Sequence, residues 1–293
     1  MGTEPGWQSR MEADVREAGG ILKASVLLRL GWRRRDLSAA VAGGTLIRIR
    51  KGHYAVPDLP PAAIRAFRVG GRLAGLSALR ARGVWTPNRA RALSVVVPTN
   101  AHGLRRPDDA SRRLLPGSVR VHWSTTEAGP GPESAELALR RAAAELAPEH
   151  LFAVFESALR AGLLSRAETE RLRELFIRTV SPHFARADDA AESGAESVVK
   201  FMLLQEGIAF LQQVEIRGVG RVDFLLGRRQ ILEADGAAYH SSPEDLERDR
   251  RREVVAAALG YRTLRCSAKL IESEIELLRD AMQALRTHGD LHS

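Results

Sequence analysis

The stretch VEIRGVGRVDFLLGRRQILEADGAAYH, from Val214 to His240, decides how the second half of this 293-residue chain folds. Apolar and polar residues alternate from Val219 to Leu226 and again from Gln230 to Asp235, which is typical of half-buried strands. The three residues between these segments, Gly227-Arg228-Arg229, have turn chemistry. The sequence therefore predicts a hairpin of two strands joined by a three-residue loop.

Such a hairpin is expected to place three carboxylates on one face. With this loop Leu226 pairs with Gln230, so Asp223 falls directly opposite Glu233, and Asp235 points to the same face as Glu233. Directly paired residues have Cβ atoms roughly 4.5–5.5 Å apart, and like charges at that separation destabilise the pair. One interpretation is a divalent cation between the carboxylates, and the other is a solvated acidic hairpin with scattered charges.

The chemistry of the acidic face favours a hard ion. A site whose ligands are all oxygen atoms suits Mg²⁺, which binds one or two carboxylates and keeps water ligands for a phosphate substrate. The opposite face is apolar and is expected to be buried through Phe224, Leu226, Leu232 and Ala234.

Residues around the hairpin add a family resemblance. Between Glu192 and Ile275 their order and spacing resemble the very-short-patch-repair-like branch of the PD-(D/E)xK nuclease superfamily. The residues that carry the resemblance are Glu196, Asp223, Glu233-Ala234-Asp235-Gly236, Tyr239-His240, Asp249, Arg252 and Gly260 to Arg265. The resemblance implies a helix with an acidic residue, a mixed sheet that holds the metal carboxylates, and flanking helices.

The resemblance also implies roles for single residues. Asp223 and Glu233, with the backbone carbonyl of Ala234, would hold Mg²⁺ or Mn²⁺ for phosphodiester hydrolysis. Asp235 stands where the superfamily usually has Lys; the very-short-patch branch also lacks that Lys and uses a nearby His. His240 is therefore the implied general base, and Asp235 either orients it or joins the metal ligands.

Two further residues of the implied catalytic set keep an alternative structural role. Glu196 is either the helical acid that binds a metal-bound water or a charge in the first turn of a helix, favoured by the helix dipole. Arg252 either faces the scissile phosphate, steadied by Asp249, or forms an ion pair with Asp249 within one helix. Gln213 precedes the hairpin at a position where the family tends to have a polar residue.

Composition limits the classes of protein that fit. The hydrophobic fraction is 44% and the charged fraction 27%, which is ordinary for a soluble globular protein. No apolar run approaches the ~20 residues of a membrane span. The single cysteine, Cys266, excludes an internal disulfide and fits a reducing, bacterial cytoplasm. The net charge of +8, carried almost wholly by Arg, favours a polyanionic partner such as the DNA of the nucleoid.

The basic charge is concentrated between Lys23 and Lys51, a window with eight Lys or Arg residues and one acid, Asp36. Its pattern predicts a helix over 21–30, a second helix over 33–41, and a basic hairpin over 46–56. This is the order of a winged helix-turn-helix. The residues expected to contact DNA lie at the start of the second helix and in the wing: Arg33, Arg34, Arg35, Arg48, Arg50 and Lys51.

Residues 19 to about 85 resemble the N-terminal domain of AbiEi-family antitoxins, on the basis of the wing LIRIRKGHYAV and the following LAGLSALR helix. Proteins of that family bind their own promoters. The alternative is a winged helix that serves as a protein-interaction module.

The expected fold class is α+β, with three regions. Residues 1–90 form the winged helix, 91–190 a strand pair (92–98 and 118–123) followed by a helical connector, and 191–293 a restriction-endonuclease-like mixed α/β core. The helices of the connector are expected at 133–147, 148–164 and 166–178, the last with a capping box at Ser165 and Glu168.

Two functions fit this organisation. The first is a metal-dependent DNA endonuclease that the winged helix delivers to its target. The second is an antitoxin-like, DNA-binding transcriptional regulator whose inactive nuclease-like domain serves for homodimerisation or for binding another protein. Three clustered carboxylates favour the endonuclease, because an inactive site has no reason to keep them together.

Overall fold

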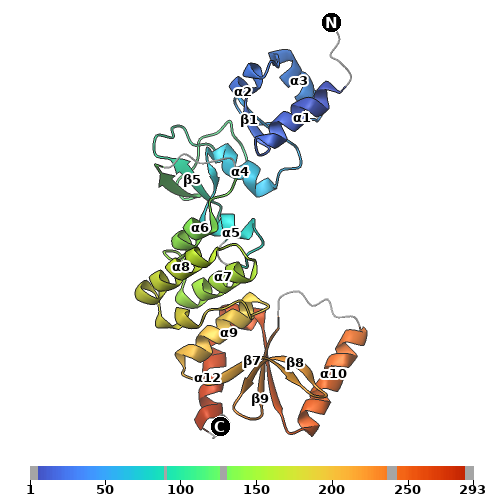
Figure 1. Cartoon of the computed structure of the whole chain (residues 1–293), viewed down its shortest axis with the longest axis vertical. Helices are drawn as coiled ribbons and strands as arrows, with labels where there is room; N and C mark the ends of the chain where they lie inside the picture. Colours follow the sequence, from blue (N-terminus) through green and yellow to red (C-terminus); the bar gives the residue numbers. More distant parts are fainter. Residues whose placement is uncertain (1–5, 89–90, 126–130, 236–242, 288–293) are drawn as a thin grey trace. The chain divides into compact units, whose positions relative to one another are not determined.

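The computed structural model describes residues 6–88, 91–125, 131–235 and 243–287, with the side chains of 235, 243, 245 and 246 excepted. The chain divides into two compact units (Figure 1). The first contains Met1–Arg82 and Ala90–Ala138, and the second contains Gly83–Arg89 and Leu139–Ser293. The chain contains both helices and mixed or antiparallel sheets, which confirms the predicted α+β class.

The first unit begins with helices around a small antiparallel sheet of order β1-β3-β2. Its elements are α1 (Trp7–Glu17), β1 (Ile21–Lys23), α2 (Ala24–Arg29), α3 (Arg34–Ala42), β2 (Ile47–Arg50) and β3 (His53–Ala55). Leu27, Leu37 and Leu46 share a buried core with α1. The indole N–H of Trp32 donates to Asp14 over 2.6 Å and joins the turn before α3 to α1. The expected helix over 21–30 is shorter, because its first three residues pair with β3 instead.

The rest of the first unit is a second sheet, of order β4-β5-β6. It is built from α4 (Pro61–Val69), β4 (Arg72–Leu73), α5 (Gly75–Arg80), β5 (Ser94–Pro98) and β6 (Arg120–Ser124). The two strands expected at 92–98 and 118–123 are present, and they pair in parallel. Helix α6 (Ala135–Ala142) crosses from the first unit into the second.

Helices of the second unit surround an aromatic cluster. They are α7 (Pro148–Arg160), α8 (Arg166–Thr179), the 3-10 helix η1 (Pro182–Arg186) and α9 (Gly194–Gln205). The ring of Phe184 lies 5.3 Å from that of Phe152 and 5.2 Å from that of Phe176, centroid to centroid. The predicted capping box at the start of α8 is confirmed, since Ser165 Oγ accepts from the N–H of Glu168 and the Glu168 carboxylate accepts from the N–H of Ser165.

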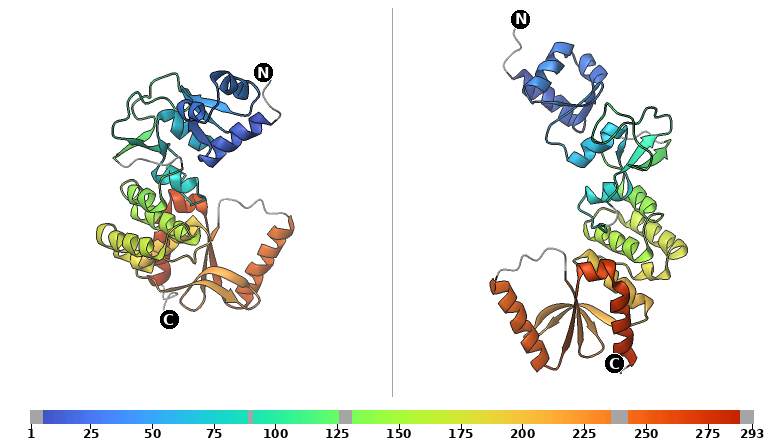
Figure 2. Two further views of the ribbon diagram at one scale, coloured as in Figure 1. Left: turned by 45° about the horizontal axis from the view of Figure 1, so that its top comes forward. Right: turned by 180° about the vertical axis from the view of Figure 1, so that it is seen from behind.

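A four-stranded sheet of order β10-β9-β8-β7 completes the second unit. Its strands are β7 (Phe210–Ile216), β8 (Gly220–Leu226), β9 (Gln230–Asp235) and β10 (Arg262–Ser267), and its further helices are α10 (Pro243–Ala258), α11 (Ala268–Ser273) and α12 (Ile275–Thr287). Helices α9 and α12 lie on one side of the sheet and α10 on the other (Figures 1 and 2). Strand β9 pairs antiparallel with β8 and parallel with β10, so the sheet is mixed.

The predicted hairpin register is confirmed, because Leu226 pairs with Gln230 and Phe224 with Leu232. The apolar face is buried as expected: Phe224, Leu226, Leu232 and Ala234 are at most 3% exposed. The two-strand interpretation of 214–240 was incomplete, because β7 is a separate strand that turns into β8 at Gly218, whose φ is +88°. Its polar sequence, with Gln212, Gln213 and Glu215, concealed it. None of the helices described is long and apolar enough to cross a lipid bilayer.

Candidate active site: a polar row across the four-stranded sheet

Four polar residues occupy one level of the sheet, one on each strand. Arg265 on β10 is the register partner of Glu233 on β9. The β8–β9 register, continued by one residue beyond Phe224 and Leu232, puts Asp223 opposite Glu233. The β7–β8 register likewise puts Gln213 opposite Asp223, between the pairs Gln212–Phe224 and Val214–Val222. We call these four residues the polar row.

The regular sheet is interrupted at this row. Gln213 has a φ of +54°, in the left-handed region, where it is the one described residue other than glycine. Neither the Gln213–Asp223 nor the Asp223–Glu233 position forms a regular ladder pair. Buried side chains also change sides here: Phe210 and Phe224 pack in the core with α9, whereas Val214 and Val222 pack with α10 residues. Left-handed backbone at a residue with a side chain costs of the order of 1–2 kcal/mol, and such residues cluster at functional sites.

Asp223 and Glu233 have different partners. The Asp223 carboxylate accepts a hydrogen bond of 2.9 Å from the N–H of Ala234, which replaces the ladder bond missing at this point. The Glu233 side chain is 13% exposed and meets two guanidinium groups, Arg265 at 3.2 Å and Arg252 at 3.4 Å. These distances exceed the ~2.7–2.9 Å of a strong charge-assisted bond. The positive charges of Arg252 and Arg265 nevertheless offset the charge of Glu233, and this reduces its repulsion with Asp223.

Backbone contacts hold Arg252 in place. Its Nε donates to the carbonyl of Val219 and its Nη2 to the carbonyl of Arg221, both over 2.8 Å. The predicted pair with Asp249 within α10 is present but long, at 4.0 Å. Asp249 also lies 3.8 Å from Arg265, so it is shared between both arginines. Arg252 is thus fixed mainly by the β7–β8 turn and by β8, with its charge directed at Glu233.

Glu196 lies at the other end of the row, on the first turn of α9. Its backbone N–H donates to the capping Ser193 hydroxyl, and its carboxylate accepts from the N–H of Glu192 (2.8 Å) and from Nε2 of Gln213 (2.9 Å). The residue is 4% exposed. Burial raises the pKa of the Glu196 carboxyl above its ordinary value, and the hydrogen bonds from Glu192, Ser193 and Gln213 oppose that rise. Glu196 therefore lies in the first turn of α9, as expected, and its carboxylate is joined to the polar row through Gln213; its role toward a metal-bound water stays a prediction.

Two predicted catalytic residues cannot be placed. The side chain of Asp235 and the whole of His240 lie outside the described residues. Among the side chains that are described, no group of three Asp, Glu, His or Cys residues is arranged to hold a metal ion. The donor set at hand is Asp223 and Glu233, two carboxylates on adjacent strands, which fits the one or two carboxylates that Mg²⁺ takes from a protein.

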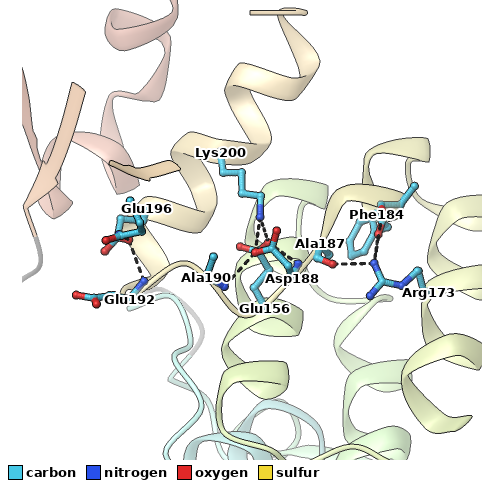
Figure 3. Close-up of polar contacts among 11 residues, drawn as sticks. Glu156, Arg173, Phe184, Ala187, Asp188, Ala190, Glu192, Glu196 and Lys200 are labelled. Atoms are coloured by element: carbon cyan, nitrogen blue, oxygen red, sulfur yellow. Dashed lines mark hydrogen bonds and ion pairs between the residues drawn. The ribbon is translucent and has the colours of Figure 1, made fainter. Parts of the chain in front are cut away.

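A buried charge cluster supports the start of α9, and the sequence interpretation missed it. Lys200 Nζ lies 2.7 Å from Glu156 Oε1 on α7 and 2.7 Å from Asp188 Oδ1 (Figure 3). The Lys200 and Glu156 side chains are 3% and 1% exposed, while that of Asp188 is 49% exposed. Burial raises the pKa of the Glu156 carboxyl, against the opposing effect of Lys200. Glu156 and Lys200 are each a single charged residue within an apolar helical run, and this pattern could have predicted a buried ion pair.

The predicted DNA-contacting residues of the first unit are mostly exposed. Arg33, Arg34 and Arg35 stand at the start of α3, and Arg48 and Lys51 lie in and beside β2. The backbone N–H of Arg33 donates to the Asp36 carboxylate over 2.8 Å, which fixes this end of the helix. Arg50 differs from the others, because its Nη2 donates to the carbonyl of Gly103 over 3.2 Å and it packs beside Gly70. Its role is at least partly structural.

No family model matches the chain, and no curated protein is similar to it. Among solved structures, the "Homing Endonuclease I-Bth0305I Catalytic Domain" is similar to 32% of this chain and 95% of that chain, with 24% sequence identity and a TM-score of 0.29. So low a TM-score supports no conclusion about activity.

Proposed function

We propose that this chain is a divalent-metal-dependent DNA endonuclease of the PD-(D/E)xK type. The observation that carries the proposal is the polar row. It places two carboxylates, Asp223 and Glu233, at one level of adjacent central strands, with two arginines directed at the second carboxylate. Burying polar and ionised groups in the middle of a sheet costs free energy, and the left-handed backbone at Gln213 adds to that cost; such local costs are typical of functional sites.

Within this proposal Asp223, Glu233 and the Ala234 carbonyl would hold Mg²⁺ or Mn²⁺. Such an ion lowers the pKa of a bound water and offsets the charge that develops on the phosphorus centre. A phosphate beside Glu233 would also meet Arg252 and Arg265, whose planar guanidinium groups suit phosphate oxygens. Arg252 is ready for this role because two backbone carbonyls already orient it.

The remaining predicted residues complete the proposed mechanism. His240 would accept the proton of the attacking water, and Asp235 would orient His240 or join the metal ligands. Glu196 would bind a water ligand of the ion through a carboxylate that Gln213 and the Glu192 N–H keep in position.

DNA delivery is assigned to the first unit as a winged helix-turn-helix of the AbiEi-antitoxin type. The order α1, β1, α2, α3, β2, β3 with the sheet order β1-β3-β2 supports this assignment. The exposed arginines at the start of α3 are where a recognition helix meets the major groove, and Arg48 and Lys51 are placed for phosphates.

A second function is favoured by one observation. Glu233 is already neutralised by Arg252 and Arg265, as it would be in a nuclease-like unit that no longer binds metal. The chain would then be a DNA-binding transcriptional regulator whose second unit serves for dimerisation or partner binding. Retained DNA binding without cleavage under all metal conditions would select this function.

The test is cleavage of plasmid and single-stranded DNA with Mg²⁺ or Mn²⁺, against EDTA. We expect cleavage by the unmodified chain with metal and none by Asp223→Asn or Glu233→Gln, with DNA affinity unchanged in both. Glu215→Gln removes an exposed carboxylate from β7 and is the matched control, which should cleave normally. Cleavage in EDTA, or by Asp223→Asn, would refute the assignment.

A further inference from the structure

A cavity of about 490 Å³ opens at the start of α9, and no step of the proposed mechanism uses it. All of its lining residues belong to the second unit, and they come from 83–88, α7, the 192–198 segment and α11. Its volume is within the range of ~300–1,000 Å³ typical of sites for small organic ligands. The lining combines aromatic rings, two carboxylates and two cations.

One wall is aromatic and is held firmly. Trp85 and His150 both line the cavity, with ring centroids 6.4 Å apart and planes inclined by 32°. The backbone N–H of Trp85 donates to the Ser157 hydroxyl over 2.9 Å. Gly194 packs so closely on the indole that a Cβ there would lie 2.1 Å from a ring carbon. The indole is therefore a fixed surface on which a planar ring can stack.

Charge decides what kind of group enters. Glu192 and Glu272 line the cavity, and Glu272 is positioned by two hydrogen bonds of 3.1 Å from the backbone and side chain of Asn88. Two carboxylates repel a phosphate but accept hydrogen bonds from amino groups. The cations Lys269 and Arg160 also line the cavity and are exposed to solvent, where they can meet phosphates outside it.

The cavity adjoins the polar row. The backbone N–H of Glu192 donates to the Glu196 carboxylate over 2.8 Å. The Glu192 carboxylate lies 2.7 Å from Arg221, which is two residues before Asp223 on β8. Glu192 therefore links the lining of the cavity to both Glu196 and strand β8.

We propose that this cavity binds one unpaired nucleobase of the substrate strand, stacked on Trp85, and that it prefers bases with an exocyclic amino group. Adenine, cytosine and guanine can donate such a group to Glu192 or Glu272, whereas thymine cannot. This inference rests on the proposed nuclease function. It makes single-stranded or locally unpaired DNA the preferred substrate class.

The test measures binding by the full chain in EDTA, which removes cleavage from the result. The probes are fluorescein-labelled oligodeoxycytidine and oligodeoxythymidine of equal length, followed by fluorescence anisotropy. We expect the unmodified chain to bind oligodeoxycytidine more tightly. Trp85→Leu should weaken that binding roughly tenfold, within the range known for one stacked base, while Trp85→Phe should retain most of it.

Two further positions, neither of them buried, keep the test valid if Trp85→Leu does not fold. Glu272→Gln should reduce the difference between the two oligonucleotides. Lys269→Glu should weaken both more than Arg228→Glu does, since Arg228 is an exposed cation in the β8–β9 turn, away from the cavity. Equal affinity for the two oligonucleotides together with no effect of these variants would overturn the inference.

The two proposals fail in different ways. If metal-dependent cleavage is present but the cavity variants bind normally, the cavity inference is wrong and the nuclease proposal stands. If cleavage is absent but the cavity variants lose affinity for oligodeoxycytidine, the nuclease proposal is wrong and the cavity remains a base-binding site.

Discussion

Replacing Lys200 with Met should be among the most destabilising single changes in the second unit. Lys200 is 2% exposed and meets Glu156, which is 1% exposed, at 2.7 Å. Without the ammonium group, the Glu156 carboxylate stays buried with the N–H of Asp188 as its principal partner, at 3.0 Å. Loss of one partner of a buried ion pair typically costs about 3–5 kcal/mol. For a unit of this size that corresponds to a fall in Tm of roughly 6–20 °C.

The double variant Lys200→Met/Glu156→Leu distinguishes the cost of leaving Glu156 without its ion-pair partner from the cost of altered side-chain packing. Because it removes both charges and keeps apolar volume, we expect it to recover most of the stability that Lys200→Met removes, as apolar replacements of buried pairs often do. Asp188 is half exposed, so water can solvate it when Lys200 is gone. Differential scanning calorimetry of the full chain gives the unfolding transition for each single variant and for the double variant.

The pH dependence gives a second measure of the same cluster. Burial raises the pKa of Glu156 in the folded state, so its contribution to stability is fully present below the carboxyl's ordinary pKa and is lost as pH rises through the folded pKa. In Lys200→Met the attraction that opposes this rise is removed, and the destabilisation should shrink as pH falls from about 8 to about 5. A cost below ~1 kcal/mol for Lys200→Met, or a double variant that costs the sum of both single changes, would refute the reasoning.

Three other changes test separate parts of the structure. Gln213→Gly should be about 1 kcal/mol more stable than Gln213→Ala in urea unfolding. Both variants lack the hydrogen bond to Glu196, but glycine accepts a φ of +54° without strain. Equal stabilities would show that the backbone at Gln213 is not strained. Replacing Arg33, Arg34 and Arg35 with Ala should lower the slope of log Kd against log salt for duplex DNA by about 0.9 for each phosphate that is no longer neutralised. Arg50→Ala should change this slope less, because the Arg50 guanidinium group is engaged with Gly103. An unchanged slope in the triple variant would remove α3 from the DNA interface. Ser165→Ala should lower the free energy of unfolding by ~1 kcal/mol in the same urea assay, because it removes the cap of α8. Ser273→Ala, at an exposed hydroxyl, should lower it by no more than about 0.5 kcal/mol. Similar losses in the two variants would mean that the capping box contributes nothing.

The sequence was sufficient for the parts of the site that depend on local pattern. Strand alternation and the turn residues 227–229 fix the β8–β9 register, and that register puts Asp223 opposite Glu233. Arg252 and Asp249 were expected within one helix, and α10 is that helix and brings Arg252 to the row. These features follow from residues close together in the chain.

The parts that depend on distant contacts were not predictable in the same way. The left-handed backbone at Gln213 is set by packing between β7, β8 and α9, because nothing in the local sequence requires that conformation. Arg265 ends a segment that carries the family resemblance, but its pairing with Glu233 was not expected, since the pairing of β9 with β10 is made across the intervening helix α10. The Lys200–Glu156 contact joins residues 44 positions apart, and a periodic pattern carries no information on such pairs.

The central claim is that Asp223 and Glu233 together hold a divalent cation, and titration of the full chain with Mn²⁺ by isothermal calorimetry tests it most directly. We predict a Mn²⁺ site in the unmodified chain and in Glu215→Gln that disappears in Asp223→Asn and in Glu233→Gln, each confirmed as folded by circular dichroism. Mn²⁺ binding that is absent from the unmodified chain, or that persists unchanged in both carboxylate variants, would contradict it.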